Sequence, residues 1–128
     1  TLAMRVSYGG RSILLTGDLD PRVERELTEQ GLMEPADVLK IPHHGSRRSA
    51  GHALLQKVHP SLAIITAGYE NSYGHPHPEV LERLASMRAT PFRTDIWGMV
   101  CVRTDGRRIE LDAFRWQADR RTQSLRRF

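Results

Sequence analysis

The residues best suited to chemistry in this sequence follow two short apolar runs. Residues 13–16 lead directly to Gly17 and Asp18, and residues 37–42 lead directly to His43 and His44. Carboxylate and imidazole groups are ligands that zinc and manganese prefer, and one carboxylate has two oxygens with which to bridge two ions. Ligand sites of open α/β sheets lie beyond the carboxyl ends of the strands. We therefore expect both ends to point at one site.

The same residues also have structural interpretations. A Gly-Asp pair is common in turns, and adjacent histidines are often one buried and one exposed side chain that bind nothing. On spacing alone both interpretations stay open. His52 is expected on the solvent side of a helix and His59 at its end, and neither is assigned a functional role.

Turn residues and hydrophobic periodicity predict the elements that must position these groups. Alternate residues from Leu2 to Tyr8 are apolar, as in a half-buried strand, and a Gly-Gly turn follows, which predicts a hairpin whose second strand leads to Asp18. Asp20 and Pro21 predict the cap and first residue of a helix. The other predicted elements are strands over residues 37–42, 61–67, 91–95, 97–104 and 107–113, and helices over 49–58 and from residue 78. This order predicts an α/β (α+β) fold, a mixed sheet with flanking helices.

Composition places the positive charge at one end of the chain. Of 19 Lys and Arg residues and 15 Asp and Glu residues, five arginines and one aspartate lie in residues 115–128, so residues 1–114 carry 14 of each sign. The tail is either a phosphate-contacting segment or a solvated terminus. Its basic residues are Arg115, Arg120, Arg121, Arg126 and Arg127.

No apolar run approaches the roughly 20 residues of a membrane helix, and the first residues lack the layout of a signal peptide. The chain is therefore expected to be soluble. A single cysteine, Cys101, excludes an internal disulfide and is expected to be a buried thiol in a strand.

Four motifs in order resemble the C-terminal part of the metallo-β-lactamase-like domain of the ComEC family of DNA-internalisation competence proteins. They are LLTGD at residues 14–18, DVLKIPHHGS at 37–46, NSYGHP at 71–76 and RTD at 93–95. The resemblance covers residues 1–111 and leaves the tail outside. It implies an αββα sandwich in which two pseudo-symmetric halves meet at a site for two divalent ions, manganese or zinc.

The resemblance also implies roles for individual residues. Asp18 matches the bridging aspartate, and the histidine pair supplies the last metal ligand. Similarity to phosphorylcholine esterases of the same superfamily favours His44 as the ligand and His43 as the group that meets the phosphate. His75 is a candidate for phosphate contact or for protonation of the leaving group.

One family feature is missing from this sequence. The signature His-x-His-x-Asp-His, or its ComEC version with an aspartate for one histidine, belongs to the N-terminal half, and the only His-x-His here is His75-Pro76-His77. Asp18, His43 and His44 are too few to saturate two ions, since catalytic zinc ordinarily takes three protein ligands. Thr1 also enters directly into a strand. We therefore expect residues 1–114 to be the C-terminal half of the domain and residues 115–128 a basic tail.

These expectations define the functional hypotheses. The first is a metal-dependent nuclease acting on the non-imported DNA strand during DNA uptake in natural transformation. Its partners are DNA and the rest of a parent membrane protein, including the missing half-domain, on the extracytoplasmic side of a bacterial inner membrane. The alternatives are a hydrolase for small phosphodiesters and a non-catalytic DNA-contacting module using the tail with Tyr69 or Tyr73. Alone, the fragment is expected to be inactive and to self-associate through uncovered apolar surface.

Overall fold

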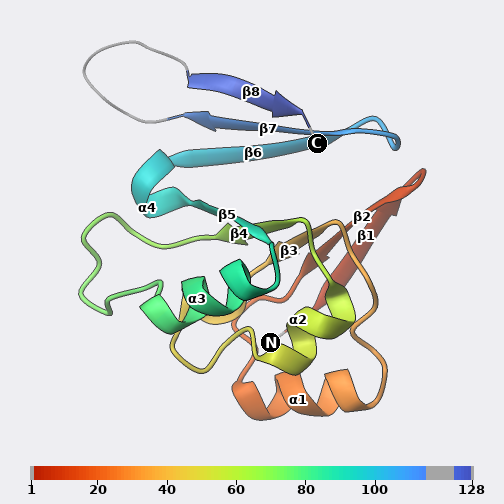
Figure 1. The fold of residues 1–128 in the computed structure, drawn as a ribbon, viewed down its shortest axis with the longest axis vertical. Coiled ribbons are helices and arrows are strands. Elements are labelled where there is room, and N and C mark those ends of the chain that lie inside the picture. The colour runs from red at the N-terminus through yellow and green to blue at the C-terminus, as the bar shows by residue number, and fades with distance from the viewer. Residues whose placement is uncertain (1, 115–122, 128) are drawn as a thin grey trace.

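Two β-sheets and one layer of helices form the part of the chain that the computed structural model describes, residues 2–114 and 123–127. Helices α1, α2 and α3 cover one face of a five-stranded sheet, and a three-stranded sheet lies on its other face (Figure 1). In chain order the elements are β1 (Met4–Tyr8), β2 (Arg11–Leu15), α1 (Pro21–Glu29), β3 (Val38–Lys40), a 3-10 turn (Pro42–Gly45), α2 (His52–Val58), β4 (Leu62–Ile65), α3 (Pro78–Ser86), β5 (Thr90–Arg93), α4 (Thr94–Trp97), β6 (Met99–Thr104), β7 (Ile109–Phe114) and β8 (Gln123–Arg127).

The five-stranded sheet is mixed, as the sequence predicts. Strands β1 and β2 form the antiparallel hairpin, and β2, β3, β4 and β5 follow one another in parallel. Leu15, Lys40 and Ile64 are aligned across the sheet near the carboxyl ends of their strands. The loops that follow β2, β3 and β4 therefore leave the sheet at the same edge.

Strand alternation divides the core between the two faces of this sheet. Leu39 is fully buried among the helices, with Leu55 and Leu84, whereas its neighbour Val38 is buried against the three-stranded sheet. Apolar side chains of β7, Ile109 among them, complete this second cluster. Successive strand residues point to opposite faces, so a continuous apolar run is buried on both.

The hairpin tips of the two sheets touch at the edge opposite the loops that follow β2, β3 and β4. Gly10 N donates to Gly106 O at 2.8 Å, and a side chain on Gly9 would place its Cβ 2.6 Å from that oxygen. Gly9 also has φ +56°, which a side chain would disfavour. Glycine is therefore required where the two turns meet (Figure 1).

The predicted cap of α1 is confirmed, because Asp20 Oδ1 accepts a hydrogen bond from Arg22 N at 2.8 Å and Pro21 opens the helix. Helix α2 begins at His52 rather than at residue 49. Glu24 of α1 accepts hydrogen bonds from Ala50 N at 2.9 Å and Gly51 N at 2.7 Å, which holds the chain out of helical geometry until there. The predicted exposure of His52 on α2 is confirmed.

Two burial predictions are wrong. Every residue of β1 is exposed, including Val6 at 44% and Tyr8 at 63%, because β1 is the edge strand of the five-stranded sheet. Cys101 is half-buried, since Val100 and Val102 take the inward positions of β6 and Cys101 alternates outward. Strand β1 therefore exposes apolar side chains, Val6 and Tyr8 among them.

Three elements were missed from the sequence: the 3-10 turn, the one-turn helix α4 and strand β8. Strand β8 pairs antiparallel with β7 along residues that the sequence assigns to a basic tail. Residues 115–122 and 128 of that tail, with Arg115, Arg120 and Arg121, lie outside the described residues. Among the helices that are described, none combines the length and apolar character needed to cross a bilayer.

Candidate metal centre

Asp18 and His44 meet beyond the carboxyl ends of β2 and β3. His44 Nε2 lies 3.4 Å from Asp18 Oδ1, and the two side chains are 44% and 55% exposed. The sequence places them 26 residues apart, and the parallel pairing of β2 with β3 brings them together. A carboxylate and an imidazole therefore face one another where solvent or a substrate can reach them.

The environment of His44 suits a metal ligand. Its Nδ1 lies 2.5 Å from the carbonyl oxygen of Thr66 and 3.1 Å from the Thr66 hydroxyl. A carbonyl oxygen only accepts, so Nδ1 donates a hydrogen bond to Thr66 O, and Nε2 is the ring nitrogen that faces Asp18. A histidine that binds a metal through one ring nitrogen ordinarily donates a hydrogen bond from its other ring N–H to an acceptor of this kind.

Backbone contacts fix the 3-10 turn Pro42–Gly45, here called the histidine turn, against the neighbouring loops. His43 and His44 both have left-handed backbone angles, φ 47° and 53°, and His43 N donates to Gly17 O at 3.1 Å. Two consecutive left-handed residues other than glycine are unfavourable unless the surrounding structure imposes them. The histidine turn is thus tied directly to the loop that carries Asp18.

Gly45 allows a second loop to approach the histidine turn. A side chain there would bring its Cβ within 2.7 Å of Pro76 Cβ, at a residue whose φ is already +81°. Through this gap Gly45 O accepts a hydrogen bond from His77 N at 2.9 Å. The loop after β4 is therefore held against the turn after β3, which brings His75 toward His43.

Histidine rings extend the site along this edge. The ring centroids of His43 and His75 are 6.1 Å apart, those of His43 and His44 are 6.5 Å apart, and those of His75 and His77 are 5.3 Å apart. Burial lowers the pKa of His75, and the neighbouring imidazoles of His77, His43 and His44 lower it further. The four residues selected from the sequence thus lie at one edge of the sheet; they are Asp18, His43, His44 and His75. His77, which was not selected from the sequence, lies there as well.

Lys40 is a charged residue of this site that sequence reasoning left without a role. It ends β3 on the face toward the three-stranded sheet, and its Nζ donates to Ile41 O at 3.0 Å. Burial lowers the pKa of Lys40, and the Asp18 carboxylate opposes that effect. A lysine within an otherwise apolar strand was the available signal, because a buried ammonium ion needs a partner.

The donors fit a metal centre in part. Within residues 2–114 and 123–127 no group of three or more His, Cys, Asp or Glu side chains could hold an ion. Asp18 and His44 have the donor types, proximity and ring orientation of ligands, but two donors do not complete the coordination of a catalytic ion. The geometry therefore provides a part of a metal centre.

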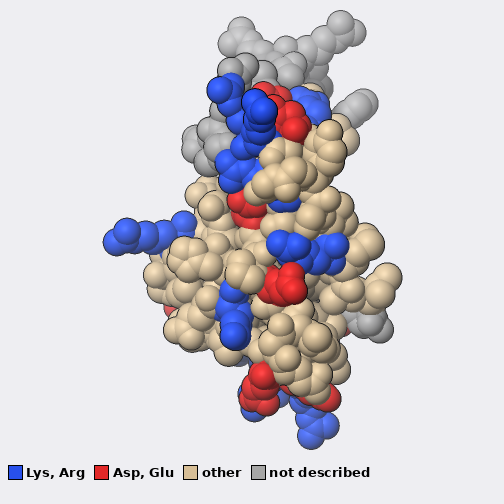
Figure 2. All heavy atoms as spheres, turned by 90° about the vertical axis from the view of Figure 1, so that its right-hand side faces the viewer, with Lys and Arg blue, Asp and Glu red and all other residues tan. Residues whose placement is uncertain are grey.

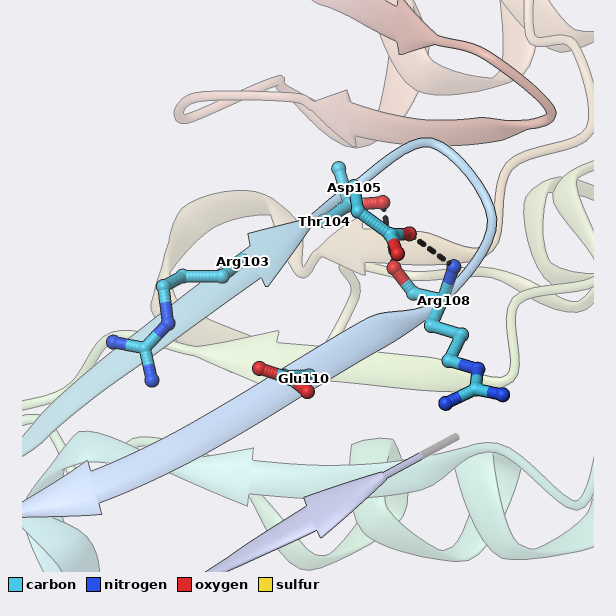
Figure 3. Close-up of a pocket in the computed structure, with 5 residues that line it drawn as sticks. All are labelled: Arg103, Thr104, Asp105, Arg108 and Glu110. Carbon is cyan, nitrogen blue, oxygen red and sulfur yellow. Dashed lines mark hydrogen bonds between the residues drawn. The ribbon is translucent and has the colours of Figure 1, made fainter.

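Two surface hollows lie away from this edge. One, of about 230 Å³, surrounds the β6–β7 turn, where Asp105 Oδ1 accepts from Arg108 N and the Thr104 hydroxyl donates to Arg108 O (Figure 3). The other, of about 350 Å³, lies near Asp37 and His59 at the opposite ends of the strands. The face with the hairpin tips shows positive and negative side chains interspersed (Figure 2). The hydrogen bonds of Thr104 and Asp105 are those of a turn, and the charged side chains are those of surface ion pairs.

Comparison with known proteins finds relatives over most of the chain, although no family model matches it. It is 40% identical over 107 residues to ComE operon protein 3 of Bacillus subtilis and 38% identical over 96 residues to competence protein ComA of Neisseria gonorrhoeae. It is 36% identical over 110 residues to recombination protein 2 of Haemophilus influenzae. These matches cover 84%, 74% and 86% of the chain but 14% of each relative. The chain therefore spans a small part of their length.

Proposed function

We propose that this chain is the C-terminal half of a metallo-β-lactamase-like domain in a ComEC-type competence protein. In this proposal the complete domain hydrolyses phosphodiester bonds of the DNA strand that is not imported during natural transformation. Similarity to proteins named for competence and recombination supports the DNA-uptake context. The observation that carries the hydrolytic role is the placement of Asp18 beside Nε2 of His44, whose other ring nitrogen faces Thr66 O.

Asp18 and His44 would hold metal together with donors of the N-terminal half-domain. Two divalent ions, when bound, would supply Lewis-acid activation of water and would stabilise negative charge on the phosphate. Asp18 would supply the carboxylate ligand that the resemblance implies for both ions, and the Thr66 carbonyl fixes the ring orientation of His44.

His43 and His75 would act on the substrate. Their rings lie 6.1 Å apart, edge to face, and the His43 ring lies 6.5 Å from that of His44, so that an anionic phosphate bound there can accept hydrogen bonds from them. His75 is the candidate to give a proton to the departing oxygen, and His43 the candidate to hold a phosphate oxygen. The contacts of Gly45 with Pro76 and His77 hold the loop that carries His75 against the turn that carries His43.

The proposed substrate sets the location and the partners. A strand that is not imported stays outside the cytoplasmic membrane, so we place the domain on the extracytoplasmic side of a bacterial inner membrane. Its partners would be DNA and the rest of the parent membrane protein.

The test compares the parent protein carrying the complete domain with Asp18→Asn and His75→Ala variants. Metal content and hydrolysis of DNA and of a small phosphodiester are measured. We expect Asp18→Asn to lose metal and activity together, and His75→Ala to keep metal and lose turnover. Hydrolysis of the small ester alone would support the alternative of a small-substrate hydrolase. DNA binding without metal or hydrolysis would support the non-catalytic module.

A further inference from the structure

Tyr73 presents an exposed aromatic ring beside the candidate metal centre. Tyr73 is 75% exposed, yet its ring stacks on the ring of His75, with 5.7 Å between the centroids and 24° between the planes. Single exposed aromatic residues are common on protein surfaces. Tyr73 differs because a ring contact orients it and because that contact leads into the site.

The loop that carries Tyr73 is closed by one side chain. Asn71 Nδ2 donates to Gly68 O at 2.9 Å and to His75 O at 2.7 Å, while Asn71 Oδ1 accepts from His75 N at 2.9 Å. These three bonds hold both sides of the loop, and Gly74 supports it with φ +68°. The loop is thus closed by its own hydrogen bonds without a ligand, which reduces the conformational entropy lost on binding.

A continuous series of rings joins Tyr73 to Asp18. Tyr73 stacks on His75, His75 lies 6.1 Å from His43, and His43 lies 6.5 Å from His44, whose Nε2 is 3.4 Å from Asp18 Oδ1. A flat group stacked on Tyr73 would therefore have its attached chain next to the imidazoles. This arrangement suits a ligand that alternates aromatic rings with anionic groups.

We infer that Tyr73 is a stacking platform for an unpaired nucleobase and gives the site a preference for single-stranded over duplex nucleic acid. Every base offers a π-face that stacks on an aromatic side chain, which makes such binding tolerant of sequence. Bases inside a duplex are already stacked on each other and cannot reach the ring. The inference deepens the proposed function, since it names the substrate form for the same site.

The test measures binding without hydrolysis. Dissociation constants of the chain for a labelled oligothymidylate and for a duplex of equal length are obtained by fluorescence anisotropy in the absence of added metal. Tyr73→Leu keeps an apolar side chain but removes the ring, and Tyr73→Phe keeps the ring. Tyr8→Leu is the matched control, because Tyr8 is 63% exposed at the opposite edge of the sheet.

We expect Tyr73→Leu to weaken single-strand binding about tenfold, from the usual contribution of one stacked base. Duplex binding and the salt dependence of binding should not change, because phosphate contacts remain. Tyr73→Phe and Tyr8→Leu should bind like the wild type. Unchanged single-strand binding by Tyr73→Leu, or an equal loss for duplex, would overturn the inference.

A measurement without variants covers the case in which Tyr73→Leu does not fold. Ring protons of Tyr73 should shift upfield in the NMR spectrum when the oligothymidylate is added, and unshifted signals at saturation would reject the platform. Both measurements are independent of metal and turnover. A parent protein that lacks hydrolase activity would refute the proposed function and leave this inference standing.

Discussion

Glu24 offers the sharpest prediction about how the fold supports the site. Glu24 is 5% exposed, and its carboxylate accepts hydrogen bonds from the backbone N–H groups of Ala50 and Gly51, at the start of α2. Arg83 of α3 donates to the carbonyl oxygens of Arg47, Ser49 and Ala50 in the same segment. Residues 47–51 directly follow the histidine turn, so Glu24 and Arg83 hold the segment that anchors it.

The cost of losing the Glu24 carboxylate follows from its bonds. A hydrogen bond to a charged group contributes about 1.5 to 3 kcal/mol to stability, and Glu24 accepts two. Burial opposes ionisation of this carboxylate and raises the pKa of Glu24 above its ordinary value, outweighing the bonds from Gly51 and Ala50 and the charge of Arg83. We therefore expect Glu24→Gln to lower the free energy of unfolding by about 2 kcal/mol, because its amide NH₂ would face a backbone N–H.

The assay is urea denaturation of the chain followed by circular dichroism near neutral pH. Glu29→Gln is the matched control, since Glu29 lies on the same helix with an exposed side chain, and it should change stability by less than about 0.5 kcal/mol. Because the pKa of Glu24 is raised in the folded state, the wild type should lose stability as pH rises from the ordinary range of a glutamate through the folded pKa. A Glu24→Gln protein as stable as the control would refute the role of Glu24 in holding residues 47–51.

Further predictions concern the site, the sheet edge and the opposite end of the strands. In the parent protein His44→Ala should lower metal content, whereas His43→Ala should spare metal and reduce turnover; equal metal loss in both would show that their roles are wrongly divided. Val6→Lys should reduce self-association of the chain in light scattering, because it charges the exposed face of β1, and unchanged association would exclude that face. Burial opposes ionisation of Asp37, but the hydrogen bond from Ser12 N and the Arg11 guanidinium outweigh it and hold the pKa of Asp37 below its ordinary value. Stability should therefore fall as pH drops through that lowered pKa, and Asp37→Asn should flatten this acid limb in denaturation curves.

Local signals in the sequence were enough to predict most of the helices and strands and to select the candidate site residues. Alternation and a Gly-Gly turn predicted the hairpin of β1 and β2, and Asp20 with Pro21 predicted the start of α1, because these signals act between neighbouring residues. The runs ending in Asp18 and His44 predicted a shared edge, because parallel strands end on the same side of a sheet.

Tertiary structure decided everything that depends on contacts between distant segments. The orientation of His44 needs the Thr66 carbonyl, which follows β4, and the start of α2 needs Glu24 from another helix. Strand β8 exists through pairing with β7, and Tyr73 gains its orientation from His75 and the Asn71 bonds. The exposure of β1 likewise depends on its place at the edge of the sheet, since the alternation of a strand shows which face is apolar but not what covers it.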